Sequence, residues 1–301
     1  MTTISINRWY HVAFVYDYPT STQSIYLDGI LEQTRQSNPY QGTTGEIILG
    51  AITNGVKRYL TGYIDEVSLM TRTKNADEIL MDATLVFYYD FDTVIYTDSG
   101  PLSLNAEGAG VSQGVNIGRI NSALYLNSSP SYFLTSGLTR LGTIGYAYSI
   151  SLWIKPSSIN GGTIIHVSKC SVSCANNWCL PFLGLTSNGT IVVQSWSGAL
   201  SKLVDVTGPT VSTDVWTHIV QTYSSNNGMR LFINGNLYNQ SRVFIYSASA
   251  APNSLFVGYF PLPVCVANSS IALGQYYGLI DEFYLFARDL TPIEVFQLAN
   301  P

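Results

Sequence analysis

Four blocks of this sequence occur twice in the same order, and this internal repeat constrains the fold more than any other feature. The matched blocks are Trp9–Asp17 with Trp216–Ser224, Ser24–Gly29 with Arg230–Gly235, Ile47–Gly50 with Leu255–Gly258, and Gly62–Arg72 with Gly278–Arg288. The separation grows from 207 residues at Trp9 to 216 residues at Gly62, because the second copy carries an insertion of about eight residues. Ordered matches of this kind indicate one structural unit used twice.

The two copies differ in what stands before them. More than a hundred residues lie before Trp216, but only eight before Trp9. We therefore expect residues 1–82 to be the truncated C-terminal half of a unit that residues 83–301 contain in full. Half a unit exposes sheet faces and edges and is not expected to be stable alone. The sequence thus suggests a fragment of a longer tandem array, or a gene model that starts within a domain.

Alternating patterns and tight turns predict an all-β fold. Residues 216–224 alternate between two faces, and Asn226-Asn227-Gly228 and Asn234-Gly235 supply turns on either side of a second strand. Residues 149–155 form a further strand, which Pro156 ends. Short strands with turns about every 8–12 residues predict an antiparallel β-sandwich of the jelly-roll type, in tandem.

A short helix is expected to close each copy, over residues 75–81 and 291–299. In the second copy Thr291, Pro292 and Glu294 form a typical helix start, with an N-cap threonine, an early proline and an acid in the first turn.

Composition excludes several classes of protein. The 301 residues suffice for two domains or one large one, and 46% hydrophobic with 11% charged residues exclude a disordered chain. No apolar run reaches the roughly 18 residues that a membrane span needs. The net charge of −5 and the scattered Lys and Arg argue against binding of nucleic acid.

Cysteines and glycosylation sequons point outside the cell, although no signal peptide is visible at the start. Three cysteines lie within ten positions and the fourth is distant, which suggests two disulfides with three possible connectivities: Cys170, Cys174, Cys179 and Cys265. The alternative is free or zinc-binding thiols, but no CxxC pair occurs. The four sequons are Asn127, Asn188, Asn239 and Asn268.

The ordered motifs Tyr148–Pro156, Trp216–Val220, Leu231–Gly235 and Gly278–Thr291 resemble the laminin G-like jelly roll of the concanavalin A-like lectin/glucanase superfamily. The upstream segments Tyr89–Asp92, Asp98–Gly100 and Gly118–Leu126 resemble its opening strands. The resemblance implies two antiparallel sheets in a secreted or surface protein that binds glycans or proteins, with calcium in some members. It does not identify the ligand, because fold does not fix function.

Catalytic chemistry is not expected. Glucanases of this superfamily place alternate carboxylates on one strand, whereas here the acids are adjacent, as Asp65-Glu66 and Asp281-Glu282. Adjacent strand residues point to opposite faces, so neither pair is expected to flank one glycosidic bond. We interpret Asp281 as buried and hydrogen-bonded, and Glu282 as paired with Arg288.

The remaining candidates are aromatic and acidic residues. Three tryptophans are expected in the core, namely Trp9, Trp153 and Trp216, and three histidines are interpreted as structural strand residues, namely His11, His166 and His218. The candidate calcium ligands are Asp90, Asp92 and Asp98. Aromatic residues expected at a ligand-binding rim, with core packing as the alternative, are Trp178, Trp196, Tyr259, Tyr276 and Tyr277.

Three functions compete on this basis. The first is a non-catalytic extracellular binding module for a glycan or an extracellular protein. The second is an accessory domain of, or a fragment from, a secreted sialidase or glucanase. The third is a structural spacer without a ligand.

Overall fold

The computed structural model describes residues 2–39, 42, 46–52, 58–171, 177–259 and 269–301. The chain divides into two compact units, Met1–Thr84 and Leu85–Pro301. Within the described residues no helix has both the length and the apolar character that crossing a bilayer requires.

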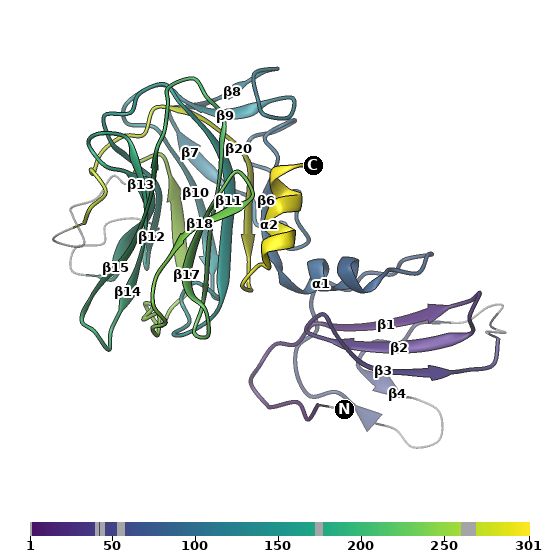
Figure 1. The fold of residues 1–301 in the computed structure, drawn as a ribbon. Helices are drawn as coiled ribbons and strands as arrows, with labels where there is room; N and C mark the ends of the chain where they lie inside the picture. The colour runs from purple at the N-terminus through teal and green to yellow at the C-terminus, as the bar shows by residue number, and fades with distance from the viewer. Residues whose placement is uncertain (1, 40–41, 43–45, 53–57, 172–176, 260–268) are drawn as a thin grey trace. The chain divides into compact units, whose positions relative to one another are not determined.

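The unit of residues 85–301 is a sandwich of two antiparallel sheets (Figure 1). In one sheet the described strands are, in spatial order, β15 (Lys202–Thr210), β14 (Thr190–Ser197), β13 (Cys179–Leu185), β12 (Gly162–Ser168), β19 (Asn253–Val257), β10 (Tyr132–Leu138) and β7 (Glu107–Ala109). In the other they are β18 (Asn236–Gln240), β17 (Gly228–Ile233), β16 (Thr217–Ser224), β11 (Tyr148–Pro156), β20 (Gly278–Phe286), β9 (Ala123–Leu126) and β8 (Val111–Gly114), with β6 (Leu85–Tyr89) paired to β20.

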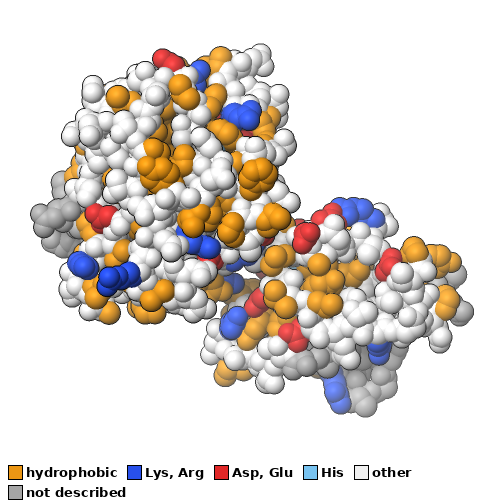
Figure 2. Space-filling view, in the orientation of Figure 1, with side chains coloured by type: hydrophobic (Ala, Val, Ile, Leu, Met, Phe, Trp, Pro, Cys, Tyr) orange, Lys and Arg blue, Asp and Glu red, His pale blue; other side chains and the backbone are white. Residues whose placement is uncertain are grey.

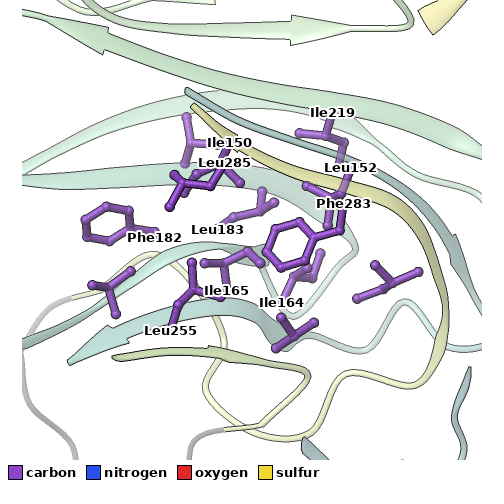
Figure 3. Close-up of a cluster of buried hydrophobic side chains, with 14 of the residues drawn as sticks. Ile150, Leu152, Ile164, Ile165, Phe182, Leu183, Ile219, Leu255, Phe283 and Leu285 are labelled. Atoms are coloured by element: carbon purple, nitrogen blue, oxygen red, sulfur yellow. The ribbon is translucent and has the colours of Figure 1, made fainter. Parts of the chain in front are cut away.

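The core lies between the two sheets. Ile150 and Leu152 of β11 and Phe283 of β20 face Ile165 of β12 and Phe182 of β13 (Figure 3). Period-two alternation sends every second side chain inward from each sheet, as the sequence predicts. Burying this many large apolar side chains is the main stabilising term of the unit.

The outer face of the sheet that contains β11 and β20 is partly covered by α2 (Pro292–Ala299). Val220, Phe232 and Phe286 form a second cluster there with Val295 of the helix. Thr291 caps α2 through the capping box that the sequence predicts, with Glu294 as the reciprocal partner.

The unit of residues 1–84 contains a three-stranded sheet in the order β1 (Val12–Asp17), β2 (Thr22–Leu27) and β3 (Ile30–Gln36). A two-stranded hairpin of β4 (Ala51–Ile52) and β5 (Arg58–Tyr59) and the helix α1 (Ala76–Thr84) complete its described elements. Trp9, expected in a core, is 59% exposed. That expectation was wrong because Trp9 stands before β1 and not within a strand, and the matched Trp216 before β16 is also only half-buried.

Candidate functional site

A β-bulge in β20 decides where the two adjacent acids point. The register between β11 and β20 shifts between Ser151 and Trp153, and Glu282 adopts a left-handed conformation with φ of 49°. A bulge adds one residue to its strand, so strict alternation fails there. Asp281 and Glu282 therefore both lie on the outer face of the sheet, and the expectation that they point to opposite faces was wrong.

Asp281 is fully buried and holds a neighbouring loop. Its Oδ2 accepts hydrogen bonds from the backbone N–H groups of Arg119 (2.7 Å) and Ile120 (3.0 Å), and its Oδ1 accepts from that of Glu282 (2.9 Å). Burial raises the pKa of the Asp281 carboxyl to about 7, although the backbone N–H groups oppose this effect. Both carboxylate oxygens are thus engaged with the protein's own backbone.

Glu282 is held by two stacked tyrosines. The Tyr88 and Tyr284 hydroxyls donate to its carboxylate at 2.9 and 2.8 Å, and the two rings stack with centroids 4.1 Å apart. Burial raises the pKa of Glu282, and the negative charges of Asp92 and Asp90 add to this effect. Glu282 is 9% exposed, whereas both tyrosines are half-buried. The carboxylate is therefore an oriented acceptor just below the surface.

Arg288 does not pair with Glu282, so that expectation was wrong. It forms an ion pair with Glu294 at 2.7 Å instead. The capping box fixes the Glu294 carboxylate beside Arg288, and the tyrosines already occupy Glu282.

An arginine and a tryptophan lie on the same outer face. The Arg119 guanidinium lies 4.6 Å from the centroid of the Trp153 ring, and Arg119 itself is exposed. The Trp153 ring lies 5.0 Å from that of His218, whose Nε2 is 2.9 Å from Ser151 Oγ. Within the described chain, the buried indole Nε1 of Trp153 finds no hydrogen-bond acceptor.

We call these five residues the Arg119–Glu282 patch: Tyr88, Arg119, Trp153, Glu282 and Tyr284. They lie on one face, because Tyr88 is opposite Tyr284 in β6 and β20, Tyr284 is opposite Ser151, and Trp153 is opposite Asp281. Arg119 joins them because its guanidinium lies over the Trp153 ring. The patch combines flat aromatic rings, an exposed cation and an acceptor carboxylate.

Comparison of the two copies distinguishes residues that both copies share for structural reasons from residues that differ between them. Asp65 Oδ1 accepts from the Glu66 backbone N–H at 3.0 Å, and Glu66 has the same φ of 49° as Glu282. At the position matched to Tyr284, however, the first copy has Ser68. The acidic pair therefore supports the backbone in both copies, whereas Tyr284, which holds Glu282, is found in the second copy and not in the first.

The structure does not gather the predicted rim aromatics into one exposed site. Tyr276 is fully buried, and its hydroxyl donates to the Leu279 carbonyl at 3.3 Å. Trp178 and Trp196 are half-buried against the core, and Trp178 Nε1 donates to the Ser247 carbonyl. Tyr259 and Tyr277 are half-buried. Tyr276 is excluded as a ligand contact because the sheet interior covers it.

The three candidate calcium ligands accept hydrogen bonds from the protein's own groups. Asp98 accepts from the backbone N–H groups of Tyr88, Gly100 and Leu104. Asp92 accepts from Asn121 and Ser122, and Asp90 from the backbone of Asp92 and the hydroxyl of Ser99. In the described part of the chain, no three His, Cys, Asp or Glu side chains form a metal-binding group. Calcium binding stays a prediction.

The other predicted residues are placed as follows. Trp153 is 6% exposed and Trp216 is half-buried. Among the described cysteines none is free, and Cys170 and Cys179 are disulfide-bonded. Cys174, Cys265 and Asn268 lie outside the described residues, so the connectivity stays a prediction. Asn127, Asn188 and Asn239 are exposed.

Sequence reasoning missed Tyr88, Arg119 and Tyr284 as site residues. Arg119 lies in the Gly118–Leu126 segment that carried the resemblance, and Tyr284 follows the acidic pair closely. The signal was the difference between copies, with Ser68 standing where the second copy has Tyr284. Strand register at the bulge decides which residues become neighbours, and the sequence pattern does not specify that register.

Comparisons with known proteins agree with this architecture. A family model described as "Concanavalin A-like lectin/glucanases superfamily" matches residues 2–80 and 127–296, a partial and a complete copy. No curated protein matches the chain.

Similar solved structures include the binding domain of Paraclostridial Mosquitocidal Protein 1, with 18% identity and a TM-score of 0.53 over 73% of this chain and 52% of that one. The receptor binding domain of botulinum neurotoxin D has 19% identity and a TM-score of 0.51 over 73% of this chain and 53% of that one. Domain 4 of AbnA, an extracellular arabinanase from Geobacillus stearothermophilus solved with arabinotriose, has 22% identity and a TM-score of 0.48 over 72% and 98%. The chain spans about half the length of the two toxin domains. At these identities the likeness shows the fold alone.

Proposed function

Because the chain belongs to the concanavalin A-like lectin/glucanase superfamily, we propose that residues 85–301 form a non-catalytic extracellular module that binds a carbohydrate. The Arg119–Glu282 patch is the proposed contact surface. The single observation that carries this proposal is the Glu282 carboxylate, which Tyr88 and Tyr284 hold in place just below the surface.

The chemistry of the patch suits a sugar. Sugar rings present C–H faces that pack on aromatic side chains, and Tyr88 and Tyr284 are half-buried, so part of each side chain is accessible to a ligand. Sugar hydroxyls both donate and accept hydrogen bonds, so an oriented carboxylate and an exposed guanidinium offer them complementary, charge-assisted partners.

The same contacts support binding rather than hydrolysis. Glycoside hydrolysis canonically uses two carboxyl groups that both reach the sugar. Asp281, the acid beside Glu282, is fully buried and accepts three backbone hydrogen bonds, so this acidic pair offers the Glu282 carboxylate alone to a bound sugar. Two solved relatives are described as binding domains, which is in keeping with this role.

An extracellular location is part of the proposal. The disulfide-bonded Cys170 and Cys179 favour an oxidising compartment, and the sequon at Asn127 is exposed. The finer expectations, glycosylation and a role in adhesion or recognition, rest on the same features.

The test is a glycan array with the full chain, followed by titration calorimetry on the best ligand. We expect Arg119→Ala to weaken binding at least tenfold, or about 1.4 kcal/mol. The matched control is Arg140→Ala, because Arg140 lies over the Tyr146 ring at 4.4 Å in a similar pair elsewhere. Equal losses in both variants, or no glycan bound, would contradict the proposed site.

Catalysis is tested separately. The full chain is incubated with β-glucans and sialosides, and no products are expected. Turnover that Glu282→Gln abolishes would show that the module is an enzyme.

A further inference from the structure

The described part of residues 1–84 leaves one face of its three-stranded sheet bare. Val12 and Phe14 of β1 are 60% and 66% exposed, whereas Ile219 and Gln221 at the matched positions of β16 are 0% and 1% exposed. Figure 2 shows hydrophobic side chains gathered on the surface of the unit that carries β1 to β3. In the complete unit this face packs against the opposing sheet.

The opposite face of the same sheet is covered as in the complete unit. Helix α1 packs on the turn at Gly29, where an added Cβ would lie 2.8 Å from Leu80. Helix α2 packs on the matched Gly235, where an added Cβ would lie 3.1 Å from Ala299. The first unit therefore forms its helix–sheet contact, whereas in its described residues the face that would meet a second sheet stays bare.

The strands that form in residues 1–84, and those that do not, also indicate that an opposing half of the domain is missing from this unit. In the complete unit β16, β17 and β18 pair with one another, and their counterparts β1, β2 and β3 form. Among the described strands, β19 pairs with β10 and β12, and β20 pairs with β6, β9 and β11. Their counterparts, residues 47–50 and 63–70, are not strands. The missing strands are those whose partners come from the first half of the domain.

We propose that the bare face and the edge of β1 that lies away from β2 dock an opening half-domain of the same type, meaning a polypeptide equivalent to residues 85–207 of this chain. A strand equivalent to β11 would pair with β1 on one side and with residues 63–70 on the other, as β11 does with β16 and β20. Its inward residues would be apolar, like Ile150 and Leu152, to meet Val12 and Phe14.

A second copy of the 1–84 unit fits this surface less well. The counterparts of β19 and β20 require partner strands from two different sheets. In its described residues, another copy offers β1–β3 and the same segments 47–50 and 63–70, and no strands of the opposing sheet. An opening half-domain supplies both sets of strands.

The experiment extends the full chain by placing a copy of residues 85–207 before residue 1. The junction keeps the register, because Thr3, Ile4 and Ser5 correspond to Thr210, Val211 and Ser212. Hydrogen exchange is measured by mass spectrometry in the original and the extended chain. We expect exchange of residues 63–70 to slow by about 100-fold in the extended chain, because these amides join a sheet. Residues 278–286 serve as the internal reference and should not change.

Two variants make the result specific. Leu69→Asp in the extended chain should remove the gain in protection, because the matched Leu285 points into the core. Ser68→Asp should keep it, because the matched Tyr284 lies on the outer face. In the original chain, which carries no added half, both variants should leave exchange unchanged.

Three outcomes would overturn the proposal. One is unchanged exchange of residues 63–70 in the extended chain. Another is full protection of these residues in the original chain. The third is protection that rises with protein concentration together with dimer formation in light scattering, which would identify a second copy as the occupant.

Discussion

At the scale of single residues, the two copies share the side chains that support the backbone. Asp28 and Asn234 both have φ of 49°, and each accepts a hydrogen bond from the backbone N–H of the matched histidine, His11 at 3.0 Å and His218 at 2.9 Å. Asp and Asn tolerate this left-handed conformation better than most residues do. The residues that both copies share are therefore those that form turns and the bulge. Residues that contact a ligand are to be expected among the positions where the two copies differ.

The burial of Asp281 predicts a large difference between matched substitutions. We expect Asp281→Asn to lower the free energy of unfolding of residues 85–301 by about 1–3 kcal/mol, because the amide leaves buried N–H donors of the Arg119 loop unsatisfied. The matched Asp65→Asn changes an exposed residue and should stay within about 0.5 kcal/mol. Urea unfolding of the full-length variants measures both, and equal effects would contradict the structural role of Asp281.

The buried His218 predicts loss of stability in acid. Burial lowers the pKa of His218 to about 3, and the charge of Arg119 adds to this effect. Below pH 6.5, the ordinary pKa of histidine, the His218 side chain takes up a proton in the unfolded chain but stays neutral in the folded chain until the pH approaches 3. The contribution of His218 to the free energy of unfolding is therefore complete above pH 6.5 and is lost as the pH falls toward 3.

The test compares the pH dependence of unfolding in two variants. His218→Gln should reduce the slope of the unfolding free energy between pH 4 and 6 by about 1.4 kcal/mol per pH unit. His11→Gln, at the matched position of the first copy, should leave the slope for residues 85–301 unchanged. An identical slope in wild type and His218→Gln would contradict the assignment.

At the scale of elements, one glutamate serves two purposes at the start of α2. Glu294 accepts from the Thr291 backbone N–H at 2.8 Å and pairs with Arg288 at 2.7 Å. The first copy repeats this arrangement, with Asn75 as the cap and Glu78 paired with Arg72. The closing helix is thus locally specified, which is why sequence reasoning located both helices.

The N-cap predicts the cost of removing one hydroxyl. Thr291→Ala should lower the free energy of unfolding by about 1 kcal/mol, because the side chain satisfies a backbone donor at the first turn. Thr291→Ser keeps the hydroxyl and should lose much less. Thermal and urea unfolding of the full chain measure both variants, and a wild-type stability for Thr291→Ala would show that the cap contributes nothing.

At the scale of the whole molecule, the two units differ in how much apolar surface they bury. Among the described residues of 1–84, the buried hydrophobic side chains are Tyr26 and Ile79. Residues 85–301 bury a continuous core between two sheets. Because burial supplies most of the stabilising free energy, the two units should differ strongly in stability.

This difference predicts uneven protection from hydrogen exchange in the full chain. Amides of β1 and β2 should exchange through openings that cost at least about 3 kcal/mol less than those of β11 and β16. The measurement is exchange followed by mass spectrometry over hours. Equal protection in matched strands would show that the bare face is covered in solution.

The sequence by itself determined the repeat, the all-β sandwich, the closing helices and the turn residues, because these depend on local spacing and on which residues tolerate particular backbone angles. Only the tertiary structure decided the face of Glu282, the partner of Arg288 and the burial of Tyr276. A bulge shifts register by one residue, and a side chain's partner is the nearest group across a sheet, which can be nearly two hundred positions away, as with Tyr88 and Glu282. Exposure depends in the same way on what packs opposite, so identical repeat positions are buried in one unit and bare in the other.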